Sequence, residues 1–162
     1  MTVSQIMEKM IKSSQGNIHD IEHFVKVWSY AKTIGELEKL DAETQFILEV
    51  EAITHDIACP MCREKYGNAN GKLQEKESPA LISAFFSDAD LSESQVERVS
   101  YVVGHHHTYE GVDGLDWQVL LEADYIVNAS ENAYSEENLQ EFLKTQAKTE
   151  VGKRLIQEVF CL

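Results

Sequence analysis

The residues of this chain best suited to chemistry are histidines and aspartates that interrupt apolar helical patterns. His55 and Asp56 end an apolar segment in which Leu48, Ala52 and His55 share one helix face. Both side chains are costly to bury without partners, and a divalent cation is the simplest partner for the pair. A core histidine hydrogen-bonded to its neighbouring aspartate would satisfy the same pattern, so the choice depends on where the other histidines and acids lie.

Further residues break the burial pattern in the same way. His23 and Asp124 each lie on the apolar stripe of a predicted helix, and His106 continues another such stripe with His105 and His107 beside it. Taken alone, each could be a core residue whose polar atoms are all hydrogen-bonded. Together they can converge inside a helical bundle, as metal ligands do in such folds. Mixed histidine and carboxylate ligands suit iron, manganese, zinc or magnesium better than copper.

The segments that must position these residues are predicted to be helical throughout, which indicates an all-α fold. Helices are expected over 3–12 and 20–39, from Asp41 to the His55-Asp56 pair, from Ser78-Pro79 onwards, from Ser92, around 117–127, and over 136–160. Ser92 and Gln95 fit a capping box, and a serine followed by proline is a favourable helix start. The stretch 59–71 is rich in glycine and asparagine, which predicts a loop that forms a wall or lid of the site.

Length and composition limit the function classes. The 162 residues are expected to form one domain, 1–162. The formal net charge of −14, without any basic run, argues against binding to nucleic acid or anionic membranes. The sequence contains no signal peptide and no apolar stretch long enough to span a membrane. Three cysteines cannot build a disulfide framework, which indicates a reducing cytoplasm.

The order His23, His55-Asp56, His105-His106 and Asp124 resembles the HD-domain superfamily of metal-dependent phosphohydrolases. The strings at 19–27, 53–57 and 121–126 look like the opening helix, the signature and the closing helix of that family. The resemblance extends over about 19–131. It implies an all-α HD-domain bundle, on which the helices of 136–160 would pack.

The resemblance also implies a set of ligands. One metal ion would be held by His23, His55, Asp56 and Asp124. Some branches bind a second ion through additional histidines, and the run 104–111 resembles their histidine pair, assigned to His105 and His106. Glu77 stands where such branches carry another histidine, although a charged residue near a helix N-terminus is an equal explanation. One or two divalent ions are therefore implied, with iron or manganese preferred and magnesium, zinc, cobalt or nickel left open.

By the same resemblance, the activity would be hydrolysis of a nucleotide or another small phosphate ester. A divalent metal lowers the pKa of a water molecule, and Asp56 could orient or deprotonate that water. Arg63 and Lys65 after the signature, and Lys26 on the first ligand-bearing helix, are the candidates for holding phosphate, although each could be a solvated surface charge. A homodimer is left open.

Three alternatives accompany this interpretation. Relatives with similar ligands use a di-iron centre to oxidise a C–H or C–P bond with oxygen, and the additional histidines keep that chemistry open. Cys59 and Cys62 have the spacing of thiol oxidoreductases and zinc sites, but neither a βαβ pattern nor a second cysteine pair accompanies them. Finally, the protein could be a binding or regulatory bundle that holds the metal only for stability. Structural metal sites are closed whereas catalytic sites keep an open position, and the sequence does not distinguish the two.

Overall fold

The computed structural model describes all residues, Met1–Leu162, and every regular element in it is an α-helix. In chain order the helices are α1 Val3–Ser13, α2 Ile18–Leu37, α3 Ala42–Thr54, α4 Cys59–Tyr66, α5 Gly71–Phe85, α6 Glu93–Val103, α7 Leu115–Glu131, α8 Glu136–Thr145 and α9 Glu150–Phe160. The all-α class predicted from the sequence is confirmed. No helix has both the length and the apolar character that crossing a membrane requires.

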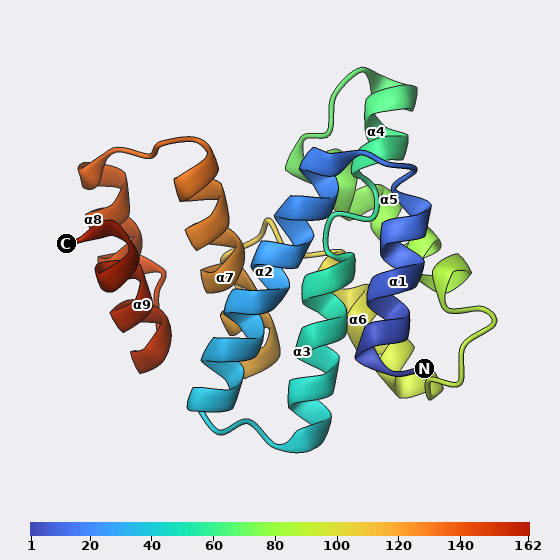
Figure 1. Cartoon of the computed structure of the whole chain (residues 1–162), viewed down its shortest axis with the longest axis horizontal. Helices are drawn as coiled ribbons and strands as arrows, with labels where there is room; N and C mark the ends of the chain where they lie inside the picture. Colours follow the sequence, from blue (N-terminus) through green and yellow to red (C-terminus); the bar gives the residue numbers. More distant parts are fainter.

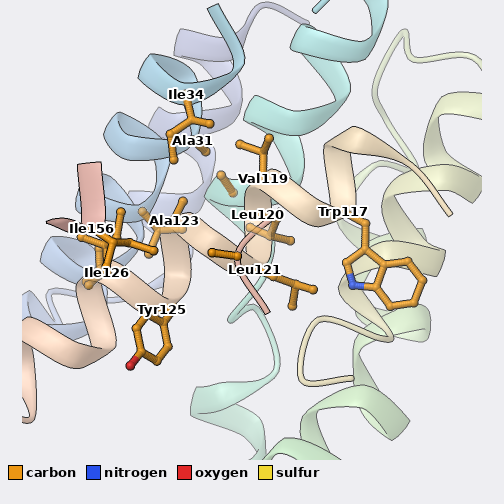
Figure 2. Close-up of a cluster of buried hydrophobic side chains, with 14 of the residues drawn as sticks. Ala31, Ile34, Trp117, Val119, Leu120, Leu121, Ala123, Tyr125, Ile126 and Ile156 are labelled. Atoms are coloured by element: carbon orange, nitrogen blue, oxygen red, sulfur yellow. The ribbon is translucent and has the colours of Figure 1, made fainter. Parts of the chain in front are cut away.

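Helices α2, α3 and α7 form the centre of the bundle and pack against one another (Figure 1). The larger apolar core surrounds α7, which is buried along most of its length. In Figure 2, Ala31 and Ile34 of α2 approach α7 from one side, and Ile156 of α9 lies beside Ile126. Because α7 is enclosed in this way, a polar residue on it needs a partner inside the protein.

A second core lies between α1, α3, α5 and α6, on the side of the bundle away from α8 and α9 (Figure 1). It contains Ile6, Phe24, Ile53, Ile82 and Val99, all fully or almost fully buried. The two cores share α2 and α3 as their common wall. The C-terminal end of α3 is therefore held on several sides, and the residues that follow it are positioned by both cores.

Helix starts follow the sequence signals closely in several places. Asp41 caps α3 and accepts hydrogen bonds from the amides of Glu43 and Thr44. Ser92 and Gln95 form the predicted capping box of α6. Helix α2 begins slightly earlier than expected because Asn17 caps it. The polar cap residues thus satisfy the free amides of each first turn.

The prediction of a loop over 59–71 is wrong, because α4 occupies its first part. Pro60 lies in the first turn of α4, where its missing amide costs nothing, and Gly67 ends the helix with a φ of 76°. The predicted helix start at Ser78-Pro79 is also wrong. Asn70 caps α5 two turns earlier, so both residues lie inside the helix, where the Ser78 hydroxyl donates to the Gln74 carbonyl.

Candidate metal centre

His23, His55, Asp56 and Asp124 converge at the centre of the bundle from α2, the end of α3, and α7. Nε2 of His23 lies 3.2 Å from Nε2 of His55, 3.2 Å from Oδ1 of Asp124 and 3.4 Å from Oδ2 of Asp56. Nε2 of His55 lies 3.5 Å from Oδ2 of Asp56 and 3.5 Å from Oδ1 of Asp124. Both histidines are buried. Two imidazoles and two carboxylates therefore direct their ligand atoms into one small space.

The far sides of the two rings fix which nitrogen faces the centre. Nδ1 of His55 is 2.8 Å from the carbonyl of Ala52, and Nδ1 of His23 is 2.9 Å from Oε2 of Glu131. Carbonyl and carboxylate oxygens only accept hydrogen bonds, so each Nδ1 must donate. In the neutral rings both Nε2 atoms then carry lone pairs that face each other. A cation between them resolves this conflict, and such outer hydrogen bonds are typical of metal-ligating histidines.

Without a cation, a proton must lie between the two Nε2 atoms, and the pKa values of His23 and Asp124 are shifted accordingly. Burial lowers the pKa of His23, but the hydrogen bond to Asp124 and the charges of Asp56 and Asp124 outweigh it and raise the pKa to about 9. Burial would raise the pKa of Asp124, yet its hydrogen bonds with His23 and His55 hold it well below the ordinary value. The cluster thus strongly attracts positive charge in a buried position.

A second group shares Asp56 with the first. The ligand atoms of Asp56, His106 and His107 all lie within 4.8 Å of one another, and Nε2 of His106 is 3.5 Å from Oδ1 of Asp56. Nδ1 of His106 donates to the carbonyl of Val103 at 2.7 Å, whereas its buried Nε2 has no hydrogen-bond partner. Buried polar atoms are rarely left unpaired. A buried nitrogen without a partner beside a carboxylate fits a metal ligand.

Asp56 therefore has one oxygen toward each group: Oδ2 faces His23 and His55, and Oδ1 faces His106. Burial would raise the pKa of Asp56, but the positive charges of His55 and His106 lower it. The carboxylate is consequently ionised and available to both groups. One carboxylate could therefore supply a ligand atom to each group.

The structure does not bring His105 into either group. Its Nδ1 donates to the carbonyl of Tyr101 at 2.6 Å, and its ring packs against Tyr101 and Trp117. His107 approaches Asp56 in its place. The physical reason is that α6 ends at Val103, so the histidine run follows a turn instead of the helical periodicity used to choose between the three.

Glu77 also lies outside both groups of possible ligands. Its Oε1 accepts hydrogen bonds from the Tyr66 hydroxyl and from Nζ of Lys65, the latter at 3.0 Å. Of the predicted ligands, His23, His55, Asp56, His106 and Asp124 are therefore brought together, whereas Glu77 and His105 are not. Glu77 is placed instead to tie the end of α4 to α5.

The predicted phosphate-binding cations are each paired with a carboxylate. Arg63 pairs with Asp20, and Lys26 pairs with Glu131 at 3.0 Å. The hydrogen bond to Asp20, together with the charges of Asp20 and Asp56, raises the pKa of Arg63. Arg63 therefore lies within electrostatic reach of the cluster, while Lys65 is bound to Glu77.

Cys59 and Cys62 are free, buried thiols on α4. Burial and the charge of Asp56 raise the pKa of Cys59, and burial raises that of Cys62. A thiol reacts as its thiolate, so raised pKa values make the pair poor redox groups. The geometry therefore gives no support to the thiol-oxidoreductase alternative.

Two residues on α7 were missed in the sequence. Asn128 donates to Oδ1 of Asp124 at 2.8 Å, and Glu131 holds His23 from its outer side. Asp124, Asn128 and Glu131 are spaced at i, i+4 and i+7, so they form a polar stripe on one face of α7. That spacing was the available signal, because polar residues at i+4 and i+7 lie on the same helix face as Asp124.

Replacing Glu131 by glutamine should weaken metal binding without unfolding the protein. The amide cannot offer the negative charge that orients Nδ1–H of His23 and makes its Nε2 a better donor to a cation. Outer partners of this kind typically contribute about 10–100-fold to metal affinity. The measurement is titration of the metal-free protein with Mn²⁺ by calorimetry. The matched control is Glu136→Gln, at an exposed position of α8, and equal affinities in the two variants would contradict the role of Glu131.

No family model, no curated protein and no solved structure matches the chain. Its function must therefore be inferred from its own residues. The site supplies buried histidine and aspartate groups that could hold a metal ion. This donor set suits several divalent metals of the first transition row as well as magnesium.

Proposed function

We propose that this protein is a metal-dependent phosphohydrolase of the HD type that cleaves a small, nucleotide-like phosphate ester. The observation that carries the proposal is the convergence of His23, His55, Asp56 and Asp124. The Nε2 atoms of the two histidines lie 3.2 Å from each other and 3.2–3.5 Å from one oxygen of each aspartate. Structural ion pairs do not need two opposed imidazole nitrogens. The order of these residues along the chain also resembles that superfamily.

A divalent cation bound there would supply positive charge to phosphoryl oxygens and lower the pKa of a water molecule toward neutrality. Asp56 would orient that water through a carboxylate oxygen, because it is ionised and has one oxygen toward each group. Glu131 keeps the His23 ring in position through Nδ1. Arg63 is available to hold a phosphate oxygen once it exchanges Asp20 for the substrate.

Two ions are favoured over one. Oδ1 of Asp56 and Nε2 of His106 face each other outside the first group, and His107 completes a second set of ligand atoms. A carboxylate between two histidine-rich groups suits iron or manganese. The three free cysteines agree with a reducing compartment, and we place the protein in the cytoplasm.

The proposal is tested by loading the metal-free protein with Mn²⁺ or, without oxygen, with Fe²⁺, and offering a panel of nucleotides and phosphate esters. We expect phosphate release that requires the added metal and stops with a chelator. Elemental mass spectrometry of the same samples should find about two ions per chain, as a two-metal hydrolase requires. Tight metal binding without turnover on any ester would contradict hydrolysis and favour a metal-stabilised binding protein.

The second group also supports one alternative, a di-iron oxygenase, because Asp56, His106 and His107 would supply ligands for a second iron ion. Oxygen uptake separates the two chemistries. A hydrolase should release phosphate equally well with and without oxygen when loaded with Mn²⁺. Oxygen consumption that depends on iron and on an added organic phosphonate, without hydrolysis of phosphate esters, would favour the oxygenase.

A further inference from the structure

The first turn of α5 lies directly against the segment that carries His106 and His107, which we call the histidine loop (104–114). A Cβ atom on Gly71 would lie 2.7 Å from Cγ and 2.9 Å from Cβ of His107. These atoms are close to the backbone, so the ring could not avoid the added carbon by a small terminal rotation. Gly71 therefore allows a close approach that no other residue would allow.

Glu75 holds the same segment by hydrogen bonds. Its Oε1 accepts from the amide of His107 at 3.2 Å and from the hydroxyl of Thr108 at 2.8 Å. Gly71 and Glu75 are one turn apart, so they present a bare backbone and a carboxylate on the same face of α5. Gly71 fixes the position of the His107 ring, and Glu75 fixes the main chain of His107.

This first turn of α5 is itself held firmly. Asn70 caps the helix by accepting from the amide of Leu73, and Nε2 of the buried Gln74 donates to the carbonyl of Ala69 at 2.7 Å. The other end of the histidine loop is held separately, because Arg98 pairs with Asp113 at 2.9 Å and with Asp116, in the first turn of α7, at 2.7 Å. Between these anchors the chain has turns but no helix of its own, and Glu75 of α5 supplies the long-range hydrogen bond to the main chain of His107.

We infer that Gly71 and Glu75 are positioning residues for His107, and that α5 thereby determines whether the second group of ligands can bind a cation. The inference rests on the proposed function, because it takes Asp56, His106 and His107 to be a metal site. It adds that this site depends on a helix that contributes no ligand to it. The first group, built by α2, α3 and α7, does not depend on α5 in this way.

The test compares Glu75→Ala and Gly71→Ala with the wild-type protein. The controls Lys76→Ala and Lys72→Ala change exposed neighbours on the same helix. Mn²⁺ per chain is measured by elemental mass spectrometry after equilibrium dialysis. We expect about two ions in the wild type and controls and about one in both variants, since lost outer contacts typically weaken metal binding on the order of 10–100-fold. Glu75→Gln should restore the second ion, because its amide oxygen can accept both hydrogen bonds.

A second measurement does not depend on metal. Amide hydrogen exchange of the metal-free protein should be faster at His107 in Glu75→Ala than in the controls, by about tenfold, because its hydrogen bond is lost. Unchanged exchange together with two bound ions in Glu75→Ala would overturn the inference. A single ion in the wild type, unaffected by His107→Ala, would also overturn it while leaving the first site intact. Two ions that require Glu75, in a protein without hydrolytic activity, would uphold it and reject only the proposed function.

Discussion

Replacing Asp56 by alanine should abolish metal binding and hydrolysis together. Asp56 is the one residue that faces both groups, with Oδ2 toward His23 and His55 and Oδ1 toward His106. Because residues that only support a ligand already contribute about 10–100-fold to metal affinity, loss of a shared ligand should reduce activity by at least about a hundredfold. Elemental mass spectrometry and a phosphate-release assay on the same preparation measure both effects.

Two further variants make this prediction specific. Asp56→Asn keeps the shape of the side chain but loses its charge, so it should fold like the wild type and still lose the metal. His105→Ala should keep the full metal content, because His105 packs on Tyr101 and Trp117 away from the ligands. Full activity in Asp56→Ala, or loss of an ion in His105→Ala, would show that the ligands have been assigned wrongly.

The all-α fold could be predicted because its signals are local. Apolar spacing identified α2 and α7, and polar caps at Asp41 and Ser92 marked two helix starts correctly. The same local rules failed between 59 and 79. Pro60 is compatible with a first turn, and Pro79 is tolerated inside α5, where the helix loses one hydrogen bond but keeps its packing through Ile82.

The candidate site could be predicted only for residues that lie on a regular helix face or at its end. His23, His55 and Asp124 lie on regular apolar faces or at their ends, and the structure brings them together. His105 and His107 follow a turn, where backbone geometry that the sequence does not reveal decides which ring points inward. Glu75 gave no signal at all, because its role arises from contact with a segment 32 positions away in the chain.

Helix α7 also has a structural role on its opposite side, and this gives the last prediction. Residues two positions apart on a helix point about 200° apart, so Glu122 faces away from Asp124 and toward α9. The fully buried Glu122 accepts from the amides of Lys148 and Thr149 at 2.6 and 2.9 Å and from Nε2 of Gln118 at 2.9 Å. A single carboxylate therefore satisfies free amides at the start of α9.

Replacing Glu122 by alanine should lower the free energy of unfolding by about 3 kcal/mol, because hydrogen bonds to a charged group are lost and buried donors are left without partners. For a chain of this length that corresponds to a melting temperature roughly 10 °C lower. Calorimetry measures the effect, with the exposed Glu137→Ala as control. Glu122→Gln should be intermediate, because one acceptor oxygen remains. The metal content of the folded variant should be unchanged, since Asp124 lies on the other face. Equal stability of Glu122→Ala and the control would show that apolar packing around Ile156, rather than the carboxylate, holds α9 in place.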